Sequence, residues 1–313
     1  VWLYRPLLQC FLNSPPHSGQ GFLLSYAFCT PEPKSLIVWQ GKGENAMPKT
    51  FCVVGHDARQ QAAAQALREA GLRVIGPEAA VLADYVLLPM SQDRVSDEVA
   101  RTLQAVRPGT LLLAGRPGAP VCRAAREANL PLIDYFQRPE LECLNAVPTA
   151  EGCLALLLQL RQRTIWESDF LVLGYGRIGR AVARRLDLLG GQVTVAARSA
   201  EQRANARCAG HKAVTMEQMT DLLPEHDTVI NTIPAMVLPR QKLRELPPQA
   251  LVVDLASSPG GTDFAAAAEL GIRAEHALAL PGKCAPRTAG ALIVQTVLGL
   301  LEERRRLDET AGD

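Results

Sequence analysis

The sequence predicts an α/β protein built from two doubly wound, Rossmann-like domains of parallel strands, joined by linking helices and separated by a cleft. Short apolar strands alternate with amphipathic helices, and the order strand, glycine-containing turn, helix, strand occurs twice, beginning at 51–55 and at 170–174. The 313 residues, 48% apolar and 21% charged, suffice for two such domains with buried cores.

The first repeat defines an N-terminal domain. We expect strands at 51–55, 72–75, 85–88, 110–114 and 132–135, with helices at 62–70, 96–106 and 121–128. Gly71 follows the first helix where a left-handed C-cap favours glycine. Because strands and helices alternate, the strands should form a parallel sheet with helices on its faces.

The second repeat begins with the strand at 170–174 and an amphipathic helix at 177–189. Further strands are expected at 192–197, 228–233, 250–255 and 272–277. Two helices should join the domains. Pro148-Thr149 suits the start of a helix over 150–163, and a helix over 288–305 has an apolar side that should return to the first domain.

The predicted boundaries are 1–46 for an irregular extension, 47–147 for the N-terminal domain, 148–286 for the second domain and 287–313 for the returning helix and tail. The extension holds seven of the fifteen aromatic residues and shows no helical or strand periodicity. Regular patterning starts just after Met47, so we expect the native chain to begin there. A genuine flexible extension is the alternative.

Charge and cysteine content narrow the class of protein. The formal net charge of +1 offers no basic field for nucleic acid or a lipid surface. Apolar runs such as 154–158 fall far short of the ~20 residues of a membrane span. The eight cysteines form no CxxC pair and have no histidine at metal-ligand spacing, so no metal site is expected. We expect a soluble, cytoplasmic protein with reduced, mostly buried thiols.

A GxGxxG motif at 174–179 follows an apolar strand and opens an amphipathic helix, the context in which this motif binds a dinucleotide. The first glycine makes the tight turn, the second admits a pyrophosphate, and the third lets helix and strand pack closely. The helix N-terminus then faces the phosphates. The expected cofactor contacts are Gly174, Tyr175, Gly176, Arg177, Ile178 and Gly179. The alternative is a glycine-rich turn in a domain that has lost its nucleotide.

The end of the next strand predicts NADP rather than NAD. An NAD site places a carboxylate there for the ribose 2′-hydroxyl, but the sequence here is Ala196-Ala-Arg-Ser199. The guanidinium of Arg198 and the hydroxyl of Ser199 suit a 2′-phosphate. A solvated surface arginine is the alternative for Arg198.

Three segments follow the later strands of the second domain, at 231–234, 256–264 and 279–283. Ligands of such sheets bind beyond the carboxyl ends of the strands, so these loops should line the nicotinamide end of the cleft. The cofactor contacts expected there are Thr232, Ile233, Pro234 and Pro281. Ordinary turns, which are also rich in glycine and proline, are the alternative.

The corresponding loop of the first domain, at 55–60, lacks the second and third glycines, so a second dinucleotide is not expected. It carries His56 and Arg59 at a helix N-terminus, which suits a small carboxylate. The alternative is that Asp57 caps the helix while Arg59 points to solvent.

Polar residues also gather at the expected hinge between the domains. Asn145, Thr149 and Glu151 could face the cleft. An equally good interpretation makes Thr149 the cap of the linking helix, with Glu151 in its first turn.

These segments together resemble the family of the A subunit of dipicolinate synthase over about 49–305. The matching segments, in order, are 53–60, 134–136, 144–152, 173–179, 197–199, 230–234, 254–264 and 280–290. HDARQ at 56–60, NAVPTAEG at 145–152 and SSPGGTDF at 257–264 are specific, whereas GxGxxG is generic. Glycine is expected in the family where this chain has His56, which argues against a general catalytic role for His56.

The resemblance implies the last step of dipicolinate biosynthesis in spore-forming bacteria, the oxidation of dihydrodipicolinate with NADP+ as hydride acceptor. It also implies an oligomer with a flavoprotein-like B subunit, in the mother-cell cytoplasm during sporulation. For this chemistry the expected substrate contacts are Arg59, His56, Asn145 and Thr149, and the candidate bases are Asp57 and Glu151.

Two other functions stay open. One is another NADP-dependent dehydrogenase of the two-domain 2-hydroxyacid or alanine dehydrogenase type, although no His–Glu–Arg set stands at recognisable loop positions. The other is a non-catalytic NADP-binding protein that organises a partner. The loss of activity expected for Arg59→Ala separates catalysis from a scaffold role.

Overall fold

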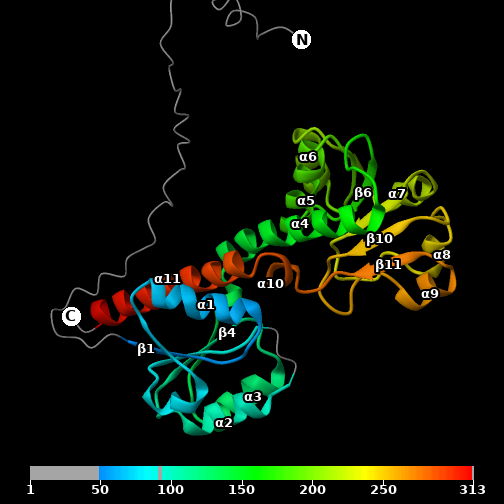
Figure 1. Ribbon diagram of the computed structural model, residues 1–313. Helices are drawn as coiled ribbons and strands as arrows, with labels where there is room; N and C mark the ends of the chain where they lie inside the picture. Colours follow the sequence, from blue (N-terminus) through cyan, green and yellow to red (C-terminus); the bar gives the residue numbers. More distant parts are fainter. Residues whose placement is uncertain (1–48, 91–93, 312–313) are drawn as a thin grey trace, which may run out of the picture. The chain divides into compact units, whose positions relative to one another are not determined.

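The computed structural model describes residues 49–90 and 94–311 (Figure 1). Residues 1–46 and the proposed start at Met47 lie outside the described residues. Sheet A has the strand order β2-β1-β3-β4-β5 and sheet B the order β11-β10-β9-β6-β7-β8, and all strand pairs within them are parallel. Two parallel α/β domains are thus confirmed.

Sheet A and its helices form the first domain. Its elements are β1 (Thr50–Val53), α1 (Ala58–Glu69), β2 (Arg73–Ile75), η1 (Pro77–Leu82), β3 (Tyr85–Leu87), α2 (Asp97–Ala105), β4 (Leu111–Ala114), α3 (Ala119–Glu127), β5 (Leu132–Asp134) and η2 (Tyr135–Gln137). Phe51 and Val53 point to the core under α1, whereas Cys52 and Val54 point to the core under α2 and α3. Strand alternation therefore buries both faces of the sheet, as an apolar parallel strand requires.

Sheet B and its helices form the second domain. Its elements are β6 (Asp169–Leu173), α5 (Arg177–Leu188), β7 (Gln192–Ala196), α6 (Ala200–Cys208), β8 (Lys212–Val214), α7 (Gln218–Leu222), η3 (Leu223–Glu225), β9 (Thr228–Asn231), α8 (Arg240–Leu243), β10 (Leu251–Asp254), α9 (Phe264–Glu269), β11 (Arg273–His276) and α10 (Leu280–Cys284). The elements β8 and α6–α9 are absent from the sequence-based expectation. Strand β8 and helices α7–α9 are too short to show periodicity, and α6 buries only Ala206, so it has no apolar face to recognise.

Helix α4 (Pro139–Arg161) corrects the predicted linking helix. It begins at Pro139, with Glu140 in its first turn, and runs through Pro148 rather than starting there. A proline at the first position is a good start, and burial of Leu141 and Ala146 offsets the backbone bond lost at Pro148.

Helix α4 is also long and apolar enough to cross a membrane by length and composition, with a mean hydropathy of 1.3 over 18 residues. Ala150, Cys153 and Leu157 are fully buried in the core of the second domain. A core helix of a folded protein also passes this test of length and composition. The apolar residues of α4 are therefore only weak evidence for a membrane span.

Helix α11 (Pro286–Ala311) packs on the first domain and lies beside α1 (Figure 1). Ile293, Val294 and Val297 are buried in the core that also holds Phe51. A Cβ built on Gly290 would lie 2.6 Å from the backbone nitrogen of Ala63, so the two helices cross in close contact at this glycine.

Two smaller expectations also change. Helix α1 starts at Ala58 rather than at 62, because Asp57 caps it. Of the cysteines in the described residues, Cys52 and Cys153 are buried, and burial raises the pKa of both thiols to about 12. Three others are exposed, namely Cys143, Cys208 and Cys284, so the thiols are not mostly buried.

Candidate functional site

The turn between β6 and α5 has the geometry of a dinucleotide-binding loop. Gly174 has a φ of +91°, a left-handed conformation that favours glycine. A Cβ on Gly179 would lie 2.2 Å from the carbonyl oxygen of Gly174, so helix and turn meet in direct contact. Sheet B has the Rossmann strand order, and β6 and β9 flank its switch point, where such sheets bind ligands.

Gly176 differs from its two neighbours in the motif. Among the described residues, nothing lies within 4 Å of a Cβ built on Gly176, and no side chain caps α5 at this position. The first amides of α5 are therefore left for an anion, and the absent side chain leaves room for one. These residues fit a pyrophosphate.

The other motif residues surround this opening. Tyr175 is buried, and burial raises the pKa of its phenol. Arg177 pairs with Glu142 of α4 at 2.7 Å and remains half exposed. Ile178 packs at the edge of the second-domain core. Helix α5 is thus anchored on its apolar side. The guanidinium of Arg177 binds the carboxylate of Glu142, and a phosphate group could take the place of that carboxylate.

The turn between β7 and α6 keeps Arg198 exposed to solvent. Arg203 of α6 holds the backbone of this turn in place. Its guanidinium donates to the carbonyl oxygens of Ala197 at 2.8 Å and Arg198 at 2.7 Å. Ser199 caps α6 by accepting from the amide of Gln202 at 3.4 Å, which leaves its hydroxyl proton free to donate. In the described residues this turn carries no carboxylate of its own.

A buried carboxylate that the sequence analysis did not identify organises the nicotinamide-side loops. Asp254, at the end of β10, is fully buried. It accepts hydrogen bonds from the side chains of Asn231 (2.9 Å) and Thr262 (2.7 Å) and from the amides of Ala256 (3.0 Å) and Gly261 (2.8 Å). The loops after β9 and β10 are therefore tied to one side chain. An aspartate ending an apolar strand, ahead of Ser-Ser-Pro-Gly-Gly, was the available signal.

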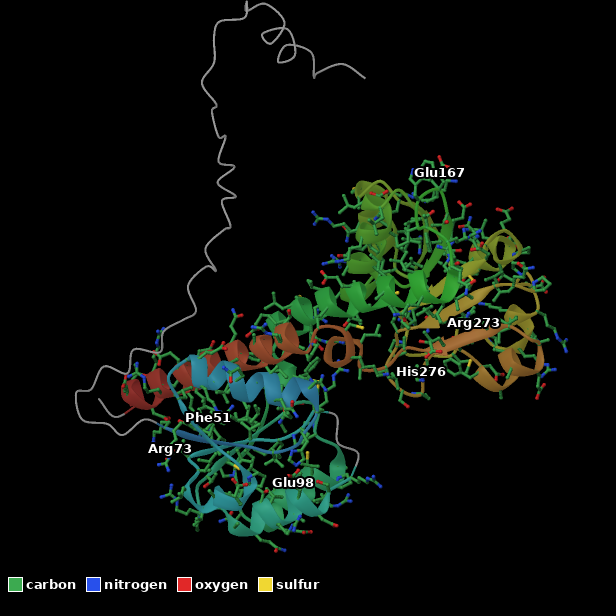
Figure 2. The ribbon with its side chains drawn as sticks, in the orientation of Figure 1. Phe51, Arg73, Glu98, Glu167, Arg273 and His276 are labelled. Carbon is green, nitrogen blue, oxygen red and sulfur yellow. The ribbon has the colours of Figure 1, made fainter. Side chains whose placement is uncertain are left out.

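The loop after β9 sits over the GxGxxG turn. The hydroxyl of Thr232 donates to the carbonyl of Leu173 at 2.8 Å, and a Cβ on Gly174 would lie 2.9 Å from Ile233. Thr232 and Ile233 thus lie beside the turn, and Pro234 is exposed next to them. His276 ends β11 (Figure 2). Its ring stacks on that of Phe264, with the ring centroids 5.0 Å apart.

The segment predicted as a loop at 279–283 is instead the short helix α10, and its Pro281 is buried. Proline at the second position of α10 and tight packing on α4 explain the helix: a Cβ on Gly152 would lie 2.9 Å from Leu280. Helix α10 also reaches the first domain, since a Cβ on Gly282 would lie 3.8 Å from Nε and Cζ of Arg59.

Arg59 lies at the switch point of sheet A, between β1 and β3. Its Nη1 donates to the thioether sulfur of Met90 at 3.0 Å, and its buried Nε has no partner in the described part of the chain. A thioether is a weak acceptor for a guanidinium. Arg59 therefore does not point simply to solvent, and its donors are poorly satisfied within the described residues.

Two neighbours of Arg59 that the sequence analysis missed are also buried. Gln60 donates to the carbonyls of Val54 (2.8 Å) and Leu87 (3.2 Å), which ties the ends of β1 and β3 together. Among the residues that the structure describes, its carboxamide oxygen has no partner, nor has the hydroxyl of Tyr135. Only tertiary packing buries these atoms, so no sequence pattern reveals them.

His56 and Asp57 take other roles. The carboxylate of Asp57 accepts from the amides of Arg59 and Gln60, both at 2.9 Å, and so caps α1. His56 is exposed and pairs at 3.1 Å with Glu98, which lies on α2. Asp57 therefore caps α1, as the alternative interpretation supposed, but the Nε of Arg59 is buried rather than directed to solvent.

The three hinge residues lie within α4 rather than before it. Thr149 is buried and donates to the carbonyl of Asn145 at 2.7 Å, so it does not cap the helix. Asn145 is half-buried. Glu151 is exposed and pairs with Arg185 of α5 at 3.1 Å. The structure does not bring Glu151 into contact with Arg59.

Comparison with known proteins supports a nicotinamide cofactor. Residues 155–259 match the family model for the NAD-binding domain of D-isomer specific 2-hydroxyacid dehydrogenases. A transhydrogenase from Sinorhizobium meliloti, 18% identical with a TM-score of 0.67, covers 82% of this chain and 94% of its own, and shares the fold. The domain match supports an oxidoreductase.

Closer similarity is found to one component of a single enzyme. The A subunit of dipicolinate synthase from Bacillus subtilis (strain 168) is 37% identical over 193 residues, which span 62% of this chain and 65% of that relative, just under two thirds. The crystal structure of the Bacillus halodurans A subunit is 28% identical with a TM-score of 0.73, over 81% of this chain and 97% of its own. The crystal structure of the Bacillus subtilis protein is 30% identical with a TM-score of 0.72, over 83% of this chain and 98% of its own. The chain belongs to the family of the dipicolinate synthase A subunit.

Proposed function

We propose that this chain oxidises dihydrodipicolinate to dipicolinate with NADP+ as hydride acceptor. The observation that carries the proposal is Arg59, whose poorly satisfied guanidinium lies at the switch point of sheet A and against Gly282 of the cofactor-binding domain. An arginine in this state suits a carboxylate, and the substrate has two. Family membership supports the same reaction.

The reaction removes two hydrogens from the ring. One leaves as a hydride and the other as a proton, so dihydrodipicolinate and NADP+ give dipicolinate, NADPH and H+. Bound NADP+ supplies the hydride acceptor. Arg59 holds a carboxylate so that the ring faces the acceptor, and the loops tied by Asp254 fix the surroundings of the nicotinamide.

Asp57 and Glu151 stay the proposed bases. The cap made by Asp57 occupies one of its oxygens, and the second is available to a proton. Glu151 pairs with Arg185 of α5 at 3.1 Å, and its second oxygen is available to a proton. Aromatisation of the ring supplies much of the driving force, so a strongly tuned base is unnecessary.

Arg198→Ala tests the choice of NADP. We expect the Kd for NADP+ to rise roughly tenfold while that for NAD+ stays unchanged, because only the 2′-phosphate loses a charge-assisted partner. Isothermal titration with both dinucleotides measures the ratio. Arg184→Ala, which removes another exposed arginine of the same domain, is the matched control. An unchanged ratio in Arg198→Ala would contradict NADP selection at this turn.

The family also suggests a partner and a place. We propose a hetero-oligomer with a flavoprotein-like B subunit in the mother-cell cytoplasm of a sporulating bacterium. His56, Asn145 and Thr149 remain proposed substrate contacts, although Thr149 now acts within α4.

The proposal is tested by dipicolinate formation, followed by ultraviolet absorbance. The full chain is supplied with dihydrodipicolinate generated in situ and with NADP+ or NAD+, in the presence and absence of the B subunit. Rapid NADP+-dependent formation is expected. Formation no faster than spontaneous oxidation, even with the B subunit, would exclude the synthase and favour another dehydrogenase or a scaffold protein.

A further inference from the structure

Three buried polar atoms of the first domain lack hydrogen-bond partners among the described residues, and their residues lie at the end of sheet A where its parallel strands have their carboxyl ends. They are Nε of Arg59, the carboxamide oxygen of Gln60 and the hydroxyl of Tyr135. Gln60 and Tyr135 are almost fully buried, with exposed fractions of 1% and 0%. A buried polar group without a partner destabilises the folded state, so such atoms at one edge require an explanation.

Tyr135 is held where the strands of sheet A end. It follows β5 directly, and a Cβ built on Gly115, just after β4, would lie 2.8 Å from its hydroxyl oxygen. Arg59 and Met90 follow β1 and β3 in the same parallel sheet. The carboxyl ends of parallel strands share one edge, so Tyr135 and Arg59 occupy the same end of the sheet.

The hydroxyl of Tyr135 is a donor at physiological pH. Burial raises the pKa of the Tyr135 phenol, more than the positive charge of Arg59 lowers it, and Asp134 and Asp57 raise it further. The proton therefore stays on the oxygen. Two donors, one of them charged, are then unsatisfied at this edge, while Gln60 keeps its carboxamide oriented by bonds to Val54 and Leu87.

We propose that the hydroxyl of Tyr135 and the guanidinium of Arg59 donate to the same carboxylate of the bound substrate. This inference rests on the proposed function and adds a substrate-binding residue to it. A carboxylate accepts up to four hydrogen bonds and carries the negative charge that complements Arg59. A carboxylate is the ligand group that such a pair of donors favours.

A hydroxyl kept for a ligand has a signature that a structural hydroxyl lacks. Tyr135→Phe removes one unsatisfied buried oxygen and keeps the ring against Gly115, so the folded state should lose no stability. The same change should weaken substrate binding. Stability and affinity therefore move in opposite directions, or stability stays constant while affinity falls.

The experiment compares Tyr135→Phe with Tyr85→Phe in the full chain together with the B subunit. Tyr85 begins β3, packs against Phe51 with the ring centroids 4.9 Å apart, and lies at the opposite end of the sheet. Dipicolinate is the probe for binding by titration calorimetry, and Tm and the KM and kcat for dihydrodipicolinate are measured in parallel. We expect Tyr135→Phe to raise the Kd and KM roughly tenfold or more with Tm unchanged or higher, and Tyr85→Phe to leave Kd and KM unchanged.

Two results would overturn the inference alone: wild-type affinity and KM in Tyr135→Phe, or a lower Tm accompanying the weaker binding. The first denies the contact, and the second makes the hydroxyl a structural group. If the wild-type protein neither binds dipicolinate nor forms it, the proposed function fails and this inference fails with it.

Discussion

Gly176→Asp should abolish dinucleotide binding while leaving the second domain as stable as before, whereas Gly179→Ala should damage both. Gly176 has a φ of −79°, which all residues adopt, and no atom of residues 49–90 or 94–311 lies within 4 Å of its Cβ position. Aspartate is also a favoured N-cap for α5. Its charge would face the pyrophosphate, and at about 4 Å such repulsion amounts to about 4 kcal/mol, roughly a thousandfold in Kd.

Gly179→Ala acts on the backbone instead. The new Cβ would lie 2.2 Å from the oxygen and 2.9 Å from the carbonyl carbon of Gly174, and neither atom can move without reshaping the turn. Forcing a methyl group into such packing costs about 1–3 kcal/mol. Thermal unfolding and NADP+ titration of both variants measure the contrast. Equal loss of stability in the two variants, or retained affinity in Gly176→Asp, would contradict this account of the motif.

Arg59→Met should lower kcat/KM for dihydrodipicolinate by about two to three orders of magnitude without lowering Tm. The loss corresponds to about 3–4 kcal/mol, the combined value of two hydrogen bonds from a charged group. Within the described residues the guanidinium has only a thioether and no partner for Nε, so the folded state depends little on it. Methionine keeps the chain length and its contact with Gly282.

Arg68→Met is the matched control, because Arg68 lies in the last turn of the same helix and is exposed. It should leave kcat/KM unchanged. Arg59→Lys should recover only part of the activity, since a lysine presents a point charge where a planar fork is needed. Steady-state kinetics of the complex check all three variants. Full activity in Arg59→Met would favour a non-catalytic, scaffold role for the chain.

The fold was predictable from sequence where local pattern and tertiary packing agree. The strand ending at Leu173, the GxGxxG turn and α5 lie almost as expected, because apolar periodicity and glycine positions specify them locally. Helix α4 shows the opposite case. Pro148 is typical of a helix start, but burial on both sides of it extends the helix back to Pro139.

The candidate site was predictable in part. Arg59 was expected at a carboxylate from its place at a helix N-terminus, but its contact with Gly282 joins segments more than two hundred residues apart and could not be inferred from spacing. Tyr135 and Asp254 were missed for the same reason. The hydroxyl of Tyr135 is left without a partner by the packing around it, whereas the carboxylate of Asp254 gains several. A single sequence does not reveal which buried polar atoms end up paired.

Helix α11 has a consequence for how the polypeptide matures. The apolar side chains of Ile293, Val294 and Val297 complete the core around Phe51, yet they are synthesised after the entire second domain. On the ribosome, the face of sheet A under α1 must therefore stay only partly covered while sheet B emerges and folds. The order of synthesis thus makes the cofactor-binding domain the first to mature, and the domain built on sheet A is completed last.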